Sequence, residues 1–407
     1  MNTLFNKRLT LNASDDKILK MKDVKTIILL FESSCEYGRE FLKGVAQYAR
    51  ERRNWHLRLY PLAVADVKNP LAGCDGIIAR SAEAANMQRL KASGLPLVDA
   101  FCQVQDPDIV GVDSDHETIA VMAAEHLMHR HFRNFAYCGY RGTRYSDMMA
   151  AAFSRTLAKA GHKCLEYGIL EKPTDAVFSD NGARKPKSPR RLAAWLAKLP
   201  PRTAIFCAND LRAYNVLNIC NEIGRKVPSD IAIIGVDNDT VLCSCASVPL
   251  SSIDPNAFNV GHTAAKVLDD LMEHRTSQQD ARSIHYVKPG DLIERESTET
   301  YPLDPPWLAK ALVHVDANIS RPLSAHNLLK IAGVSHTALQ KTFKRKVGMS
   351  PGRYILSVKM REAQRLLETK KILVKEIAMR TGFPDPKYFC RTYHAYFGHP
   401  PSLANVE

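Results

Sequence analysis

Short apolar runs alternate with amphipathic segments along the first 300 residues of the chain. The run Lys25–Phe31 (KTIILLF) has the composition of a buried strand, and Glu40–Glu51 (EFLKGVAQYARE) follows it with apolar residues at helical spacing. Later runs of strand type are HLRLY, CDGIIA, LPLVDA, DIVGVD, NFAYCGY, TAIFCAND and DIAIIGVDND. Strands that alternate with helices are typical of a parallel, helix-covered sheet. Roughly ten strands exceed one compact sheet, so we predict a two-lobed α/β fold.

The pattern changes at Pro289–Trp307, where four prolines stand among few apolar residues. Proline cannot donate a backbone hydrogen bond and disfavours helix in the residue before it. After this segment only helical spacing remains. We therefore expect a tail at 1–23, an α/β domain at 24–300, a linker at 301–306 and an all-α domain at 307–407. Within the α/β domain, Ser179–Pro189 is predicted to be a mobile, polar and basic loop.

One local layout occurs twice in the helical segment. In the first copy a short apolar helix precedes Gly333, which makes the turn, and Ser335 caps the next helix. In the second copy Gly382 makes the turn and Asp385 is the cap. Pro386 then takes the first helical position, where its missing N–H would be unpaired in any residue. Each copy is the layout of a helix-turn-helix motif, whose second helix enters the DNA major groove.

The outward positions of the two copies are candidates for DNA contact. Between the copies, Tyr354–Glu368 is predicted to be one amphipathic helix, about 22 Å long at about 1.5 Å per residue. A rigid helix of that order could hold two motifs near one DNA turn, about 34 Å, apart. The predicted DNA-binding residues are Ser335, His336, Thr337, Gln340, Lys341, Lys344, Arg345, Asp385, Lys387, Tyr388 and Arg391.

Positive charge is concentrated in the same segment. From Pro305 onward there are 17 Lys and Arg against 6 Asp and Glu, whereas the whole chain of 407 residues carries a net charge of +13. Most of the excess therefore lies on about a quarter of the chain, as phosphate neutralisation requires. We predict double-stranded DNA as a partner.

The rest of the composition argues against several classes of protein. No run of eighteen or more apolar residues exists, which argues against a membrane partner. The first 23 residues lack the apolar core of a signal peptide. The 10 cysteines form no CxxC pair or metal-like spacing, so a reduced, cytoplasmic protein without a metal or cofactor is expected.

The helical segment resembles a known family. LLKIAGVSHTALQKTFKRKVGMSP and VKEIAMRTGFPDPKYFCRTYHAYFGHPP are similar to the AraC/XylS-type DNA-binding domain, with both turn glycines, the GF-x-D-P-x-Y-F run and a G-x-x-P after each second helix. Where that family has phenylalanine followed by basic residues, this chain has Tyr393, His394 and Ala395. The second motif is therefore less basic than the resemblance implies.

The α/β segment resembles the effector domain of LacI-type regulators, which are related to periplasmic sugar-binding proteins. The resemblance rests on TAIFCANDLRAYNVLNICNEIGRKVPSDIAIIGVDND, on GDLIEREST and on DSDHETIAVMAAEHLMHRHFRNFAYCG. It implies a periplasmic-binding-protein-like fold with a ligand at the carboxyl ends of the strands, as in open α/β sheets generally. Polar residues that follow such strands are candidates for binding sugar hydroxyls: Asp237, Asn209, Asp210, Arg212, Asp115 and Asn238.

These residues have a second interpretation, because Asp and Asn also cap helices. Asn209 is expected to do some of each. Aligned on Phe153, Met149 stands where LacI-type sensors commonly have a ligand-binding arginine, with Arg141 and Arg144 nearby.

The order of the two domains resembles the bacterial xylose operon regulators. The resemblance implies a sugar effector, D-xylose or a related pentose. The LacI-like lobe, whose relatives associate side by side, implies a homodimer. Our hypothesis is that this dimer activates transcription by docking at promoter half-sites, where it could recruit RNA polymerase.

The alternative from another class is a sugar-modifying enzyme with a DNA-binding tail. HLMHRH, at His126–His131, has no carboxylate at ligand spacing and is interpreted as structural. No phosphate-binding loop, G-x-S-x-G or G-x-G-x-x-G run occurs. We therefore predict a regulator and not an enzyme.

Overall fold

The computed structural model describes residues 24–60, 71–81, 84–103, 106–168, 189–275, 283–368 and 372–403. The expected tail at 1–23 and all of the loop Ser179–Pro189 except its last residue lie outside these residues. The chain divides into two compact bodies. The first body runs up to Ser114 and includes Asn256–Val287, and the second comprises Asp115–Pro255 and the chain from Lys288 onward.

The first body contains a six-stranded sheet in the order β11-β5-β4-β3-β1-β2, with every described strand pair parallel. Its elements are β1 (Lys25–Leu30), α1 (Glu36–Arg52), β2 (Trp55–Tyr60), β3 (Gly76–Ala79), α2 (Ala84–Lys91), β4 (Leu97–Asp99), β5 (Val110–Ser114), α8 (Ala257–Met272) and β11 (Ile284–Val287).

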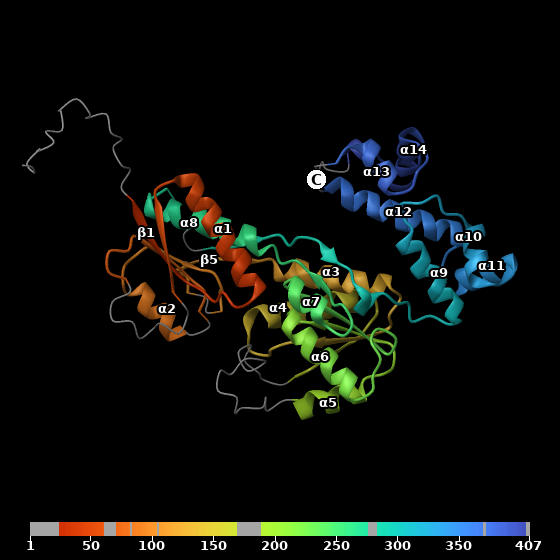
Figure 1. The fold of residues 1–407 in the computed structure, drawn as a ribbon, viewed down its shortest axis with the longest axis horizontal. Helices are drawn as coiled ribbons and strands as arrows, with labels where there is room; N and C mark the ends of the chain where they lie inside the picture. Colours follow the sequence, from red (N-terminus) through yellow and green to blue (C-terminus); the bar gives the residue numbers. More distant parts are fainter. Residues whose placement is uncertain are drawn as a thin grey trace, which may run out of the picture. The chain divides into compact units, whose positions relative to one another are not determined.

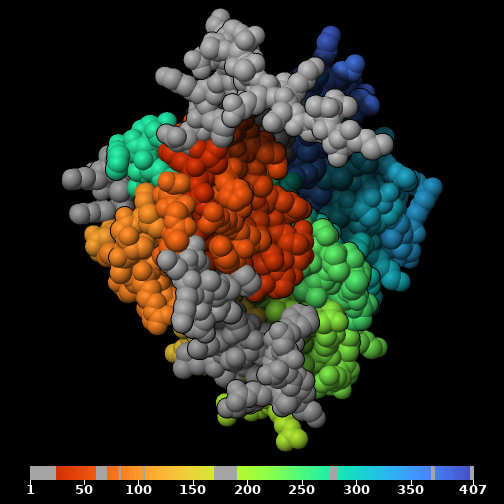
Figure 2. Space-filling model, turned by 60° about the vertical axis from the view of Figure 1, so that its left-hand side comes forward, coloured from red at the N-terminus to blue at the C-terminus, as the bar shows by residue number. Residues whose placement is uncertain are grey.

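Helices α1 and α8, far apart in sequence, lie side by side in the first body, and the teal segment that contains α8 adjoins the red segment of α1 (Figures 1 and 2). Glycines allow this close approach. A Cβ on Gly44 would lie 1.9 Å from the carbonyl oxygen of Phe258, and one on Gly261 would lie 2.0 Å from that of Phe41. Two helices therefore pack on each other over one face of the sheet with little space between their backbones.

The second body contains a six-stranded sheet in the order β12-β10-β9-β8-β6-β7, in which β12 pairs antiparallel with β10 and the other described pairs are parallel. Its elements up to residue 298 are α3 (His116–His129), β6 (Asn134–Cys138), α4 (Arg144–Lys159), β7 (Cys164–Glu166), α5 (Pro189–Lys198), β8 (Thr203–Cys207), α6 (Asp210–Glu222), β9 (Ile231–Val236), α7 (Thr240–Cys245), β10 (Ser251–Ile253), β12 (Leu292–Ile293) and the 3-10 helix η4 (Glu296–Thr298).

Successive residues of the central strands enter two different apolar clusters. Phe135 and Tyr137 of β6 pack with α3 and α4, whereas Ala136 and Cys138 pack with α5 and α6. Because side chains alternate across a strand, this sheet is covered by helices on both faces.

The helical segment comprises α9 (Pro306–Ala317), α10 (Ala325–Ala332), α11 (His336–Lys346), α12 (Pro351–Glu368), α13 (Val374–Arg380), α14 (Pro386–Phe397) and the 3-10 helix η5 (Pro401–Leu403). Its core is divided along α12. Tyr354 and Val358 pack with α9, α10 and α11, whereas Met360 and Leu367 pack with α13 and α14. One long helix thus contributes buried residues to the core of each helix-turn-helix motif.

The predicted fold class is confirmed: a two-lobed α/β fold precedes a segment with two helix-turn-helix motifs. The strands that the apolar pattern missed, β7, β10, β11 and β12, have two to four residues each, too few for a period-2 pattern to be recognised. The predicted helix at Tyr354–Glu368 begins earlier, at Pro351. Among the described residues, no helix is both long and apolar enough to span a bilayer.

Candidate functional site

Strands β6 and β8 of the second body end on three polar residues that contact one another. Asn209 is the N-cap of α6, and its Oδ1 accepts hydrogen bonds from the Arg212 backbone N–H at 2.9 Å and from the Tyr140 hydroxyl at 3.3 Å. The Arg212 guanidinium lies over the Tyr140 ring, 4.3 Å from its centroid, and the residue is only 2% exposed. Tyr140 was missed by the sequence analysis, although the end of the CGY strand was visible in it.

Strand β9 ends on two residues in the left-handed region. Asp237 has φ 111° and Asn238 has φ 48°, and both side chains are half-buried. Non-glycine residues in this region carry backbone strain, which concentrates at functional sites. Arg295, which the sequence analysis did not single out, donates to Asn238 Oδ1 at 2.8 Å and to the Leu250 carbonyl at 2.8 Å. The strained turn is thus fixed by a guanidinium from the segment that follows β12.

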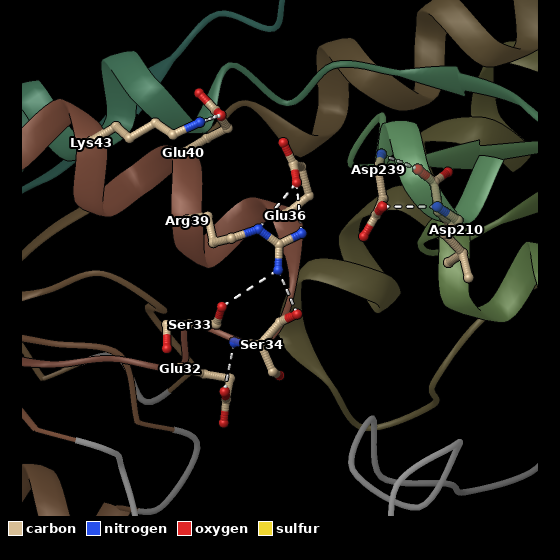
Figure 3. A network of polar contacts seen from close by, with 10 residues as sticks. Glu32, Ser33, Ser34, Glu36, Arg39, Glu40, Lys43, Asp210 and Asp239 are labelled. Atoms are coloured by element: carbon tan, nitrogen blue, oxygen red, sulfur yellow. Dashed lines mark hydrogen bonds and ion pairs between the residues drawn. The ribbon is translucent and has the colours of Figure 1, made fainter. Parts of the chain in front are cut away.

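Asp210 is directed into the second body. It is 1% exposed, and its carboxylate accepts from the Ser252 hydroxyl at 2.6 Å. The carboxylate also accepts from the backbone N–H of Asp239 at 2.8 Å (Figure 3). A Cβ on Gly235 would lie 2.1 Å from its Oδ1, so β9 approaches this carboxylate as closely as only glycine permits. Burial raises the pKa of the Asp210 carboxyl to about 7. This geometry joins the ends of β9 and β10 to α6.

Three of the polar residues that follow strands cap helices, as the second interpretation expects. Asp115 caps α3 and accepts from the Thr118 backbone N–H at 3.0 Å, Asp239 caps α7, and Asn209 caps α6. Asp237 and Asn238 cap no helix among the described elements. Asp237 and Asn238 therefore differ from the three capping residues in having positive φ values that no capping role explains.

Met149 is fully buried. It belongs to the apolar cluster that contains Tyr140, Phe153 and Phe206. The side chain at this position of α4 therefore contributes to the core of the second body.

The strand ends of the first body carry an arginine among aromatic rings. The Arg80 guanidinium follows β3 and lies 4.5 Å from the ring centroid of Phe101, 5.1 Å from that of Tyr37 and 6.0 Å from that of Phe31. Its buried Nε has no hydrogen-bond partner among the described residues. Sequence analysis missed Arg80. The sequence feature that could have identified Arg80 is its position as a charged residue directly after the buried run CDGIIA.

The loop after β1 is braced by a second arginine of the first body. Arg39 of α1 donates to the Ser34 carbonyl at 2.6 Å and to the Glu36 carboxylate at 2.6 Å, and the Ser34 N–H donates to Glu32 at 2.9 Å (Figure 3). These bonds hold the backbone at the carboxyl end of β1.

The two helix-turn-helix motifs have the local geometry that the sequence predicts. Ser335 Oγ accepts from the Ala338 N–H at 3.3 Å, and Asp385 Oδ1 accepts from the Tyr388 N–H at 2.8 Å. Gly333 and Gly382 have φ of 63° and 64°. All predicted DNA-binding residues are exposed except Gln340, which is half-buried.

The HLMHRH run lies at the carboxyl end of α3. Burial lowers the pKa of His126 to about 3, of His129 to about 2 and of His131 to about 4, so all three are neutral at physiological pH. No group of three or more possible metal ligands occurs in the part of the chain that the structure describes.

The arginine within the same run connects α3 to the helical segment. Arg130 is 3% exposed and forms ion pairs with Asp316 of α9, at 3.0 Å, and with Glu294. Its guanidinium lies 4.8 Å from the ring centroid of Tyr301. The Tyr301 hydroxyl donates to Asp316 at 2.6 Å and shares a hydrogen bond of 2.8 Å with the Tyr354 hydroxyl. We call Arg130, Glu294, Tyr301, Asp316 and Tyr354 the Arg130 cluster.

Comparisons with known proteins agree with this architecture. Residues 124–298 match the periplasmic binding protein-like domain, and residues 328–404 match a helix-turn-helix domain. The chain is 26% identical over 394 residues to the xylose operon regulatory protein of Escherichia coli K12, covering 94% of this chain and 97% of that protein. The corresponding protein of Haemophilus influenzae is 23% identical over 381 residues, covering 91% and 95%. A solved structure of the xylose-binding transcription activator XylR matches with a TM-score of 0.59 and 25% identity over 94% of this chain and 98% of that one.

The fold is that of a DNA-binding transcription regulator, because a periplasmic-binding-protein-like domain precedes two exposed, basic helix-turn-helix motifs. In domain content and order the chain is similar to the xylose operon regulatory proteins. These relatives are regulators, and nothing in the comparisons supports the enzyme alternative.

Asp210→Asn is expected to weaken the pH dependence of stability. The folded-state pKa of about 7 lies above the ordinary value of 3.8. Between these values the folded protein therefore holds a proton that the unfolded chain has released, and stability falls as pH rises through that window. The melting temperature of the wild type should fall between about pH 4.5 and about pH 7.5, by the equivalent of a few kcal/mol. The asparagine variant, which cannot ionise, should show a smaller fall, and an equal fall in both proteins would contradict the assignment.

Proposed function

We propose that this chain is a xylose-responsive transcription activator of genes for pentose catabolism, acting as a homodimer in the cytoplasm. The observation that carries the proposal is the match over 94% of the chain to proteins described as xylose operon regulatory proteins, with both domains in the same order. Calorimetric titration of the purified protein with D-xylose, L-arabinose and D-ribose tests it. Saturable binding of D-xylose is expected, and no binding of any of the three pentoses would contradict the proposal.

We propose that the effector binds at the carboxyl ends of the strands. In the second body, Asp237, Asn238 and the Tyr140–Arg212 pair supply carboxylate, amide, hydroxyl and guanidinium groups that suit sugar hydroxyls. Asn209, Asp210 and Asp115 act mainly by fixing these strand ends, since their carboxylate or amide oxygens accept hydrogen bonds from the protein.

Asp237→Gly is expected to abolish D-xylose binding without lowering the melting temperature by more than about 3 °C. Glycine adopts a φ of 111° without strain, and relief of about 1 kcal/mol of strain offsets lost side-chain contacts. Titration calorimetry and thermal melting measure the two effects separately. The matched control is Asp230→Ala at the other end of β9, where the Asp230 carboxylate accepts from the Lys226 backbone N–H at 3.0 Å. That control should bind D-xylose as the wild type does.

We propose that α11 and α14 bind successive major grooves of promoter half-sites. The exposed basic residues of α11, Lys341, Lys344 and Arg345, and those of α14, Lys387 and Arg391, supply the positive charge. Direct base contacts are proposed for His336, Thr337 and Gln340, since the amino-terminal residues of a recognition helix face the base edges. A bound dimer beside a promoter would then recruit RNA polymerase.

Lys344→Ala is expected to weaken DNA binding about tenfold at low salt. The slope of log Kd against the logarithm of the salt concentration should also decrease by about one. A lysine that neutralises one phosphate releases about one counterion on binding. Fluorescence anisotropy over a salt series measures the slope. Lys226→Ala removes an exposed lysine of the second body and serves as the control. Unchanged slopes in both variants would mean that α11 does not contact the DNA backbone at Lys344.

We propose that the Arg130 cluster carries the effector signal to the DNA-binding motifs. Helix α3 begins at the capping residue Asp115, directly after β5 of the first body, and ends at Arg130, which contacts Asp316 of α9. A change at the beginning of α3 on effector binding is therefore passed to α9 and α12 through buried contacts. This mechanism requires effector and DNA to bind with a coupling free energy, which is the same in both directions.

Asp316→Asn is expected to remove the coupling while both ligands still bind. The amide keeps the shape but not the charge that Arg130 faces. D-xylose should change the Kd for DNA about tenfold or more in the wild type and less than about twofold in the variant. Asp304→Asn is the control, because Asp304 pairs with Arg202 at 2.6 Å and both side chains are largely exposed, so the pair contributes little. Full coupling in Asp316→Asn would contradict the proposed route.

A further inference from the structure

The two helix-turn-helix motifs differ in the surroundings of their turns. Gly333 and Gly382 are equivalent in the two motifs and have nearly the same φ, 63° and 64°. A Cβ on Gly333 would meet nothing within 4 Å. A Cβ on Gly382 would lie 2.5 Å from the carbonyl oxygen of Arg321 and 2.8 Å from that of Ile319. The turn of the second motif therefore lies directly against the backbone that leads from α9 to the first motif.

A buried lysine occupies the same junction. Lys359, in the middle of α12, is 6% exposed, and its ammonium donates to the Gly382 carbonyl at 2.8 Å and to the Arg321 carbonyl at 3.1 Å. The ammonium also lies 5.3 Å from the ring centroid of Phe383. One cation thus binds the turn of the second motif, the entry segment of the first motif and the helix that both motifs share.

A buried charge of this kind is costly unless its hydrogen bonds are made. Lys359 makes them to backbone carbonyls, so they depend on how the two motifs are placed and not on the side chains that they carry. Any rotation of one motif against the other would separate the ammonium from one of its two acceptors. The carbonyl of Arg321 is also the atom that a Cβ on Gly382 would meet, so both contacts fix the same distance.

We propose that Lys359 and Gly382 are positioning residues for DNA recognition: they hold the two motifs at one fixed spacing and orientation, and so make the protein select for the distance between its two half-elements. This inference rests on the proposed reading of DNA by both α11 and α14. Two rigidly connected motifs bind with a high effective concentration only when the site matches their spacing, whereas loosely connected motifs tolerate other spacings. Inserting two base pairs displaces a half-element by about 7 Å and rotates it by about 70°.

The test compares two DNA duplexes for each protein. One is a duplex selected from a random library by the wild-type protein, and the other has two base pairs inserted between its half-elements. For the wild type the ratio of the two dissociation constants is expected to be about 100. In Lys359→Met, which keeps the length of the side chain and removes its charge, the ratio should fall to about 10 or less, with weaker binding to the selected duplex.

Gly382→Ala and Gly333→Ala form a matched pair, because the same methyl group is added at the same φ in the two motifs. Gly382→Ala should lower the spacing ratio as Lys359→Met does, whereas Gly333→Ala should leave it unchanged. Circular dichroism and thermal melting identify the variants that remain folded, and either Lys359→Met or Gly382→Ala is sufficient for the comparison. A loss of stability alone would weaken binding to both duplexes equally and would not change the ratio.

Two results would count against different statements. A wild-type ratio retained in every folded variant of Lys359 and Gly382 would overturn the positioning role. A wild-type ratio near one, with the second half-element making no difference to affinity, would overturn the reading of DNA by both motifs.

Discussion

The buried guanidinium of Arg130 is the interaction on which the organisation of the second body depends. It closes the carboxyl end of α3, and its two acidic partners come from the segment after β12 and from α9. A charge that is 3% exposed must keep its partners, because breaking such a pair costs about 3–5 kcal/mol. Tyr301 covers the guanidinium and belongs to the core of the first helix-turn-helix motif. The predicted linker is therefore partly core, and the α/β fold continues into the helical segment without a flexible spacer at this residue.

Helix α3 connects the Arg130 contact with the point at which the chain leaves the first body. The division between the two bodies falls between Ser114 and Asp115, and Asp115 is the N-cap of α3. A helix of 14 residues is about 21 Å long and transmits a displacement as a rigid rod. One end of α3 lies where the chain leaves the first body, and Arg130 at the other end forms an ion pair with Asp316 of α9. The turn at Asp237 and Asn238, with two non-glycine residues at positive φ, lies in the same body.

The two helix-turn-helix motifs show how a repeated sequence acquires two roles. Their caps, turn glycines and exposed basic faces are alike, so each can present a helix to DNA. Only the second has its turn buried against its neighbour, with Lys359 bridging the two. The repeat provides two candidate recognition helices. In our proposal the asymmetric junction holds them at one fixed spacing.

The sequence by itself determined most of the elements, the fold class and the two helix-turn-helix motifs, because apolar periodicity, caps such as Ser335 and Asp385 and turn glycines act within a few residues of the chain. It also located the polar strand ends of the second body, since strand ends are local features. Only the tertiary structure decided which of these side chains are engaged within the protein. Asp210 faces inward onto Ser252, whereas Arg80, Tyr140, Arg295 and Arg130 gain their roles from partners distant in sequence. The contact of Lys359 with Gly382 and Arg321 is of the same kind. Such contacts depend on packing between elements, and a pattern along one chain does not encode which elements meet.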